Sequence, residues 1–284
     1  MAVYKQSYRG YAGALMPDRH RIWVVHTFAR RRVFRSRLLT TLYFLCLLVP
    51  LVELIAVYLA SNLTFLSQIG GTRLLTIDNN FFSNYLYYSC AFAFLFTAFA
   101  APGLVAPDLT QGALTLYLSR PLTRLEYLAG KFSVLFLMLS SLTWVPALVV
   151  FAVQCNLGGA AWRAQYLWMG PSLLFAALIW ISVLSLLALA TSAWVRWRIV
   201  AAGVLLGIDF LGAGFSQAVN AALGTKTGDL FSFMQLHVVI WTDMFRLPPL
   251  PLSLVVEAWV VVALVAAGSL ALVLRRLRAF EVVK

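Results

Sequence analysis

The stretch LLVPLVELIAVYLA, from Leu47 to Ala60, decides the fold of this chain. It carries one acidic side chain in an otherwise apolar run, and it lacks the apolar/polar alternation of membrane β-barrel strands. Lipid offers no hydrogen-bond partners to the backbone, so an apolar run of this kind spans a bilayer only as a helix. The stretch therefore predicts a membrane-spanning helix.

Five further stretches share this apolar character. Each holds about 20 residues, which as a helix rise about 30 Å and cross the hydrocarbon core of a bilayer. Of the 284 residues, 62% are hydrophobic and only 11% are charged, against about 25% charged in soluble domains. We predict an all-α integral membrane protein whose six spans are Leu38–Leu59, Tyr85–Val105, Ser133–Val153, Ser172–Ala193, Ile199–Val219 and Leu252–Leu274.

The distribution of Lys and Arg predicts the orientation. Eighteen of the 22 basic residues lie before the first span, in the second and fourth loops, or after the last span. Cytoplasmic loops of membrane proteins carry such an excess of Lys and Arg. We therefore expect both termini to be cytoplasmic, in a multi-pass protein of a bacterial cytoplasmic (inner) membrane.

Residues 1–37 form a basic segment before the first span. Within it Val25, Ala29 and Val33 recur at helical spacing, and arginines fill much of the remaining surface. This pattern predicts an amphipathic helix on the inner leaflet. The alternative is a solvated basic tail, which would leave Trp23 in water.

The second loop, residues 106–132, is an ordered polar interruption between apolar spans. Asp108 and Gln111 have the spacing of a capping box, so they predict the start of a short cytoplasmic helix. Apolar neighbours one helical turn apart would form one face of that helix. These neighbours are Leu114, Tyr117 and Leu118.

A corner and a second helix follow. Pro121 biases Arg120 away from helical geometry and ends the short helix. Thr123 and Glu126 form a second capping box, so a new helix should begin there and continue into the third span. The apolar face of the short helix can bury itself among lipid headgroups or in a groove on a cytoplasmic partner. The two capping boxes, which define where each helix begins, favour burial in a groove on a partner.

The same loop resembles the loop between the second and third spans of type 2 ABC transporter permeases. That family pattern has an acidic residue, Gly, a Leu-rich run, Ser-x-Pro, Ser/Thr-Arg and Gly-Lys. Here Asp108 stands where Glu is commoner, and Ala113 where Thr is common. The matching positions are Asp108, Gly112, Leu114 to Leu118, Ser119 with Pro121, Thr123 with Arg124, and Gly130 with Lys131.

The resemblance implies a permease domain over residues 38–284 and an exporter subunit in which this loop is the coupling helix docking on an ATPase. No G-x-x-x-x-G-K-[ST] phosphate loop occurs in the sequence. ATP and Mg²⁺ would thus bind a separate ABC ATPase, and this chain would hold no cofactor. A second permease copy, identical or different, would complete the assembly. The implied docking residues are Asp108, Gly112, Leu114, Tyr117, Leu118, Arg120, Pro121 and Arg124.

Membrane lipids would be further partners, and nothing in the sequence points to nucleic acid. A non-transporting membrane anchor or regulatory subunit is the main alternative to an exporter. A membrane enzyme is a third class, but the sequence has neither H-E-x-x-H nor G-x-S-x-G and pairs no His with Cys as metal ligands. We therefore expect no catalytic or metal-binding residue in this chain.

Intramembrane acids are costly and usually face a polar interior. Asp209 lies midway along the fifth span, with Ser216 and Gln217 about two turns further on. Asp209 could line a substrate path, form a structural hydrogen bond or couple to protons. For Glu53, in the outer part of the first span, a solvated interfacial position is the leading interpretation.

Two further features complete the expectations. Residues 220–251 form an external loop that is apolar but too broken to span, so it should fold back against the membrane or the spans. Gly203 and Gly207 have the spacing that lets membrane helices approach closely. They predict a packing or dimer face, although Gly is also simply common in membrane helices.

Overall fold

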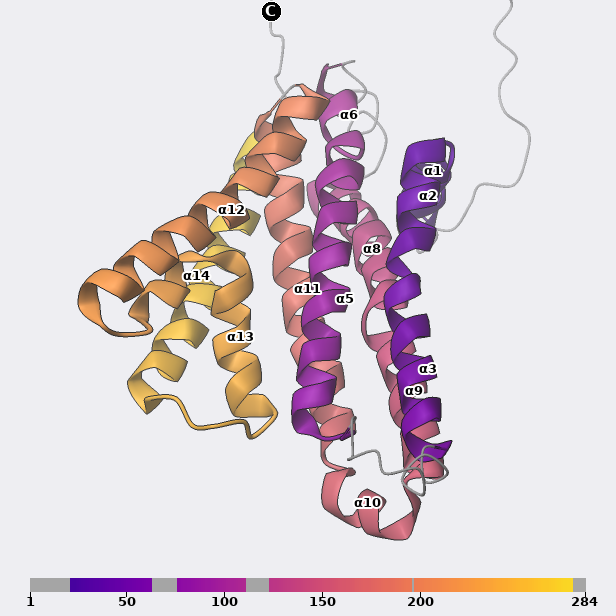
Figure 1. The fold of residues 1–284 in the computed structure, drawn as a ribbon. Helices are drawn as coiled ribbons and strands as arrows, with labels where there is room; N and C mark the ends of the chain where they lie inside the picture. Colours follow the sequence, from indigo (N-terminus) through magenta and orange to yellow (C-terminus); the bar gives the residue numbers. More distant parts are fainter. Residues whose placement is uncertain (1–20, 63–75, 111–122, 196, 278–284) are drawn as a thin grey trace, which may run out of the picture.

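The protein is an all-helical, multi-pass integral membrane protein. A computed structural model describes residues 21–62, 76–110, 123–195 and 197–277 (Figure 1). Six helical stretches are long and apolar enough to cross a membrane, and they confirm the six predicted spans. The stretches are Arg37–Asn62, Asn79–Asp108, Arg124–Leu157, Met169–Trp194, Arg198–Leu223 and Leu252–Arg276.

Spans 1 and 3 are each built from two helices with a break between them. Span 1 comprises α2 (Arg37–Cys46) and α3 (Leu48–Asn62), and span 3 comprises α8 (Arg124–Leu142) and α9 (Trp144–Leu157). The third residue after each break is a proline, Pro50 or Pro146. Proline lacks the N–H of the helical ladder and crowds the preceding turn, which accounts for both breaks.

Span 2 changes its helical geometry near Pro102 and Pro107. It runs from α5 (Asn79–Ala100) through the 3-10 helix η2 (Ala101–Gly103) into α6 (Ala106–Thr110). The Ser192 hydroxyl of span 4 accepts hydrogen bonds from the backbone N–H groups of Val105 and Ala106, at 3.3 and 3.2 Å. Such a side chain satisfies backbone donors that the kink leaves without helical partners.

The centre of the bundle is formed by α5 and α11 (Met169–Trp194), the spans with the largest buried shares. Phe82, Tyr85 and Trp180 are fully buried among them. Span 5, α12 (Arg198–Leu223), and span 6, α14 (Leu252–Arg276), are much more exposed. Figure 1 shows α12 and α14 diverging from the central helices.

The segment between spans 5 and 6 folds back among the helices. It contains the 3-10 helix η3 (Thr227–Phe231) and α13 (Phe233–Met244). Helix α13 packs against α14, α12, α11 and α5, and its apolar side chains are largely buried. This segment therefore belongs to the bundle, although α13 is too short to be a seventh span (Figure 1).

Helix α1 (Arg21–Phe34) precedes span 1 and packs mainly against α8. Val25, Ala29 and Val33 are buried at that contact, whereas Trp23 and Phe28 are exposed. The predicted helix and its apolar face are confirmed. The position of the helix on an inner leaflet remains a prediction.

Trp and Arg side chains pair near both ends of the bundle. The Arg246 guanidinium lies 4.3 Å from the Trp168 ring centroid, and that of Arg276 lies 5.6 Å from Trp194. The short helix α10 (Gly159–Tyr166) lies at the end opposite α1 and α6 (Figure 1). Amphipathic rings of this kind are enriched at the headgroup level of bilayers.

Candidate functional site

A buried charged cluster lies where span 2 ends and span 3 begins. The Lys131 ammonium is 2.7 Å from Asp108 Oδ2, and Arg32 Nη1 is 3.3 Å from Asp108 Oδ1. The Tyr127 hydroxyl donates to Asp108 Oδ2 at 2.9 Å. Asp108 is only 4% exposed and Lys131 2% exposed. We call these four residues the junction cluster, because they join α1, α6 and α8.

The position of Asp108 corrects one prediction. It is the third residue of α6 and not the residue before a helix, so it does not start a short helix as an N-cap. Its carboxylate instead binds Lys131, Arg32 and Tyr127. Because a buried carboxylate without partners is very costly, these contacts determine its position. Gln111, its proposed capping partner, lies outside the described residues.

The predicted start of α8 is confirmed. The Thr123 hydroxyl accepts a hydrogen bond from the Glu126 backbone N–H at 3.2 Å, and Glu126 Oε2 accepts from the Thr123 backbone N–H at 2.7 Å. These reciprocal bonds satisfy donors at the helix start. Arg124 is the first residue of α8, and its side chain is exposed. The other predicted docking residues lie outside the described residues: Gly112, Leu114, Tyr117, Leu118, Arg120 and Pro121.

The junction cluster links the helices on either side of residues 111–122. Asp108 lies before those residues in the chain and Lys131 after them, so their ion pair joins α6 to α8. Arg32 adds helix α1 to the same cluster. These contacts could not be predicted from the sequence, since no local pattern relates Arg32 to residues so far along the chain.

A close helix crossing holds α1 against α8. A Cβ atom added to Gly130 would lie 2.8 Å from Val25 Cβ, so only glycine fits at this contact. Next to Val25, His26 Nδ1 lies 3.0 Å from the Oγ of Ser133, a residue one turn after Gly130. Burial lowers the pKa of His26, and the nearby charge of Arg30 lowers it further.

We expect the contact between α1 and α8 to weaken in acid. A His whose pKa is lower in the packed state than in the detached state favours packing at neutral pH, and that advantage falls as pH drops below the detached value of about 6.5. Spin labels on cysteines replacing Phe28 and Ala129, in a Cys155→Ser background, should show a larger separated fraction at about pH 5.5 than at about pH 7.5. His26→Asn should abolish the difference. An equal response in both proteins would contradict the assignment.

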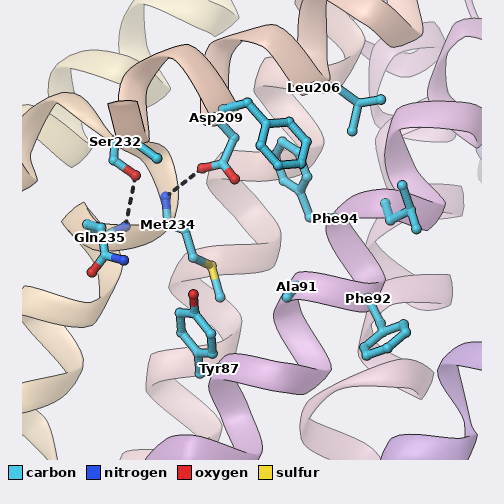
Figure 2. Close-up of a pocket in the computed structure, with 12 residues that line it drawn as sticks. Tyr87, Ala91, Phe92, Phe94, Leu206, Asp209, Ser232, Met234 and Gln235 are labelled. Carbon is cyan, nitrogen blue, oxygen red and sulfur yellow. Dashed lines mark hydrogen bonds between the residues drawn. The ribbon is translucent and has the colours of Figure 1, made fainter. Parts of the chain in front are cut away.

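A second candidate site is a cavity of about 410 Å³ between α5, α12 and the start of α13. Asp209 of α12 lies at its edge, and Asp209 Oδ1 accepts a hydrogen bond from the Met234 backbone N–H at 3.1 Å. Tyr87, Ala91 and Phe94 contribute from α5. Figure 2 shows the Asp209 carboxylate and the Tyr87 hydroxyl directed toward the same space. Asp209 therefore forms one of the predicted contacts, a structural hydrogen bond, and also lines a cavity, whereas its predicted place along a substrate path stays a prediction.

The other predicted polar residues are not part of this cavity. Ser216 is buried, and its hydroxyl donates to Asp229 at 3.1 Å. Asn220 Nδ2 donates to the same Asp229 oxygen at 2.7 Å, so Ser216 helps to hold η3 on α12. Gln217 is exposed. Glu53 is half-buried on α3, a helix that contributes nothing to the cavity lining.

Gly203 and Gly207 form no helix contact within the described part of the chain. A Cβ added to Gly203 would meet no atom within 4 Å, and one added to Gly207 would meet only Leu211 of the same helix. Close packing within the chain therefore occurs not at these two glycines but at Gly212 of the same helix, which approaches Phe231, and a dimer face at Gly203 and Gly207 remains a prediction. Both glycines line an open groove along α12.

No family model matches the chain, and no curated protein matches it. Among the described residues, no group of three or more His, Cys, Asp or Glu is placed to hold a metal ion.

Proposed function

We propose that this protein is the membrane-spanning permease subunit of an ATP-driven exporter of the type 2 ABC class. The observation that carries the proposal is the junction cluster. Asp108 and Lys131 lie near the two ends of the sequence stretch that resembles a coupling helix. They form a buried ion pair at the ends of two spans. A push on that segment would reach spans 2 and 3 directly.

The proposed mechanism is mechanical. A cytoplasmic ATPase that closes on ATP and Mg²⁺ presses on residues 111–122. The junction cluster passes the displacement to α6 and α8. Arg32 carries it to α1. Two permeases and two ATPases would form the assembly. The open groove on α12 that Gly203 and Gly207 line supports a second copy as its occupant, since small residues allow close helix contact.

Subunit association tests the docking assignment. A tagged chain purified from its own cells should bring down a phosphate-loop ATPase. Leu118→Asp combined with Arg124→Glu should abolish this, because the change removes an apolar contact and reverses a charge at the proposed interface. Arg163→Glu is the matched control, since Arg163 is exposed on α10 at the opposite end of the bundle. Full recovery of the ATPase with the double variant would contradict the assignment.

Reconstitution separates an exporter from the alternative, a non-transporting anchor or regulatory subunit. In vesicles that contain both subunits, an exporter should show ATP turnover stimulated by its cargo and accumulate that cargo on one side. An anchor should bind the ATPase without either effect.

A further inference from the structure

The cavity beside Asp209 combines an acidic side chain with apolar surroundings. Its lining is mainly apolar and aromatic, with Phe92, Phe94 and Phe210 among the residues that line it. A volume of about 410 Å³ falls within the range of sites for small organic molecules. The cavity can therefore hold the apolar body of a compound with one or two rings.

The start of α13 favours Asp209 as a carboxylate. Asp209 Oδ1 accepts from the Met234 N–H, and Ser232 Oγ accepts from the Gln235 N–H at 3.3 Å. Unpaired N–H groups and the helix dipole give this end of α13 a partial positive charge, which stabilises an anion. The hydrogen bond uses one carboxylate oxygen, and the other is directed into the cavity in Figure 2.

That second oxygen has no cation beside it within the described part of the chain. Asp209 takes part in none of the ion pairs of that part, and no Lys or Arg lines the cavity. The Tyr87 hydroxyl, at the opposite wall, forms no hydrogen bond to another described residue. A carboxylate in an apolar site gains most from a partner that brings a positive charge and N–H donors.

We propose that this cavity binds a hydrophobic amine, with Asp209 as its counter-ion and the phenylalanine rings against its apolar body. An ammonium group would bond to the free carboxylate oxygen, and Tyr87 could accept a further N–H. Aromatic faces attract cations as well as apolar surface. If the chain is an exporter, as proposed above, hydrophobic amines are its class of cargo. This part of the proposal rests on the proposed export function.

Direct binding tests the proposal with the full chain in phosphatidylcholine nanodiscs, which present no net lipid charge. The probe is dansylcadaverine, a fluorescent naphthalene sulfonamide with a primary amine, and its N-acetyl derivative is the neutral control. Asp209→Asn should weaken binding of the amine by about tenfold or more, the scale of a lost charge-assisted hydrogen bond. The N-acetyl derivative should bind the unaltered chain correspondingly less tightly and should not respond to Asp209→Asn.

Two further variants keep the test decisive. The amide oxygen that Asp209→Asn introduces can still accept from Met234, so the start of α13 should be retained. Ala91→Trp should fill the cavity and prevent binding of both probes, although Asp209 itself is not substituted. Leu211→Ala, on the exposed side of α12, should leave both affinities unchanged.

Equal affinity for the two probes, no effect of Asp209→Asn, or no measurable binding of the amine would each overturn the proposal. No ATPase is present in this experiment. A failed amine site therefore leaves the co-purification result standing, and a failed ATPase association leaves the binding result standing.

Discussion

Lys131→Met is expected to destabilise the protein by roughly 3 kcal/mol, because it leaves the buried Asp108 carboxylate without its closest cation. We use the lower end of the usual range, since Arg32 and Tyr127 still contact the carboxylate. For a domain of this size the change corresponds to a fall in melting temperature of about 6–12 °C. Thiol-reactive dye labelling in detergent can report it, because Cys46 and Cys90 are buried in the native protein.

A double-mutant cycle assigns this effect to the pair. Asp108→Asn together with Lys131→Met should cost clearly less than the sum of the two single changes, because the double variant leaves no unpaired buried charge. Arg35→Met is the matched control: Arg35 is an exposed residue of the same basic region, and the expected change is within about 0.5 kcal/mol. Equal melting temperatures for Lys131→Met and Arg35→Met would contradict the burial of the cluster.

Gly212→Ala and Gly214→Ala are expected to change stability in opposite directions. A Cβ on Gly212 would lie 2.5 Å from the Phe231 carbonyl oxygen, so α12 and the turn before α13 would have to separate. Overpacking of this kind costs about 1–3 kcal/mol. A Cβ on Gly214 would meet no atom within 4 Å, and the better helix propensity of alanine should leave stability unchanged or raise it by up to about 1 kcal/mol.

The two alanine variants differ by one methyl group at neighbouring positions of the same helix, so each is the control for the other. Melting temperatures by the same cysteine assay provide the measurement. Gly212→Ala should also weaken the Asp209–Met234 hydrogen bond, because the turn that it displaces leads directly into α13. Equal stabilisation by both substitutions would show that α12 does not approach residue 231 closely.

Features that depend on local sequence could be predicted, and those that depend on distant contacts could not. The spans follow from apolar runs, so their predicted ends coincide with the observed ends or lie inside them, by nine residues at the start of span 3. The Thr123 capping box is confirmed because its partners are three residues apart. The junction cluster was missed because Arg32 and Asp108 are 76 residues apart. The small residues of span 5, Gly212 among them, indicated a packing face, but the segment that Gly212 approaches could not be identified from the sequence.

The polar residues of span 5 show the same limit. Helical spacing grouped Asp209 with Ser216 and Gln217 as one candidate surface. The structure separates them, because η3 returns along α12 and its Asp229 engages Ser216. A side chain placed one or two turns from Asp209 thus serves a different contact. Only the three-dimensional arrangement of the fold-back segment distinguishes the two roles.

The ion pair between Asp108 and Lys131 also closes the intervening polypeptide into a ring through non-covalent contacts. The entropy lost on closing such a ring rises only logarithmically with its length, by about 0.6 kcal/mol for each doubling. Insertions or exchanges between residues 110 and 123 should therefore leave the spans almost as stable as before. A different recognition sequence should therefore be accepted there without rebuilding the membrane part.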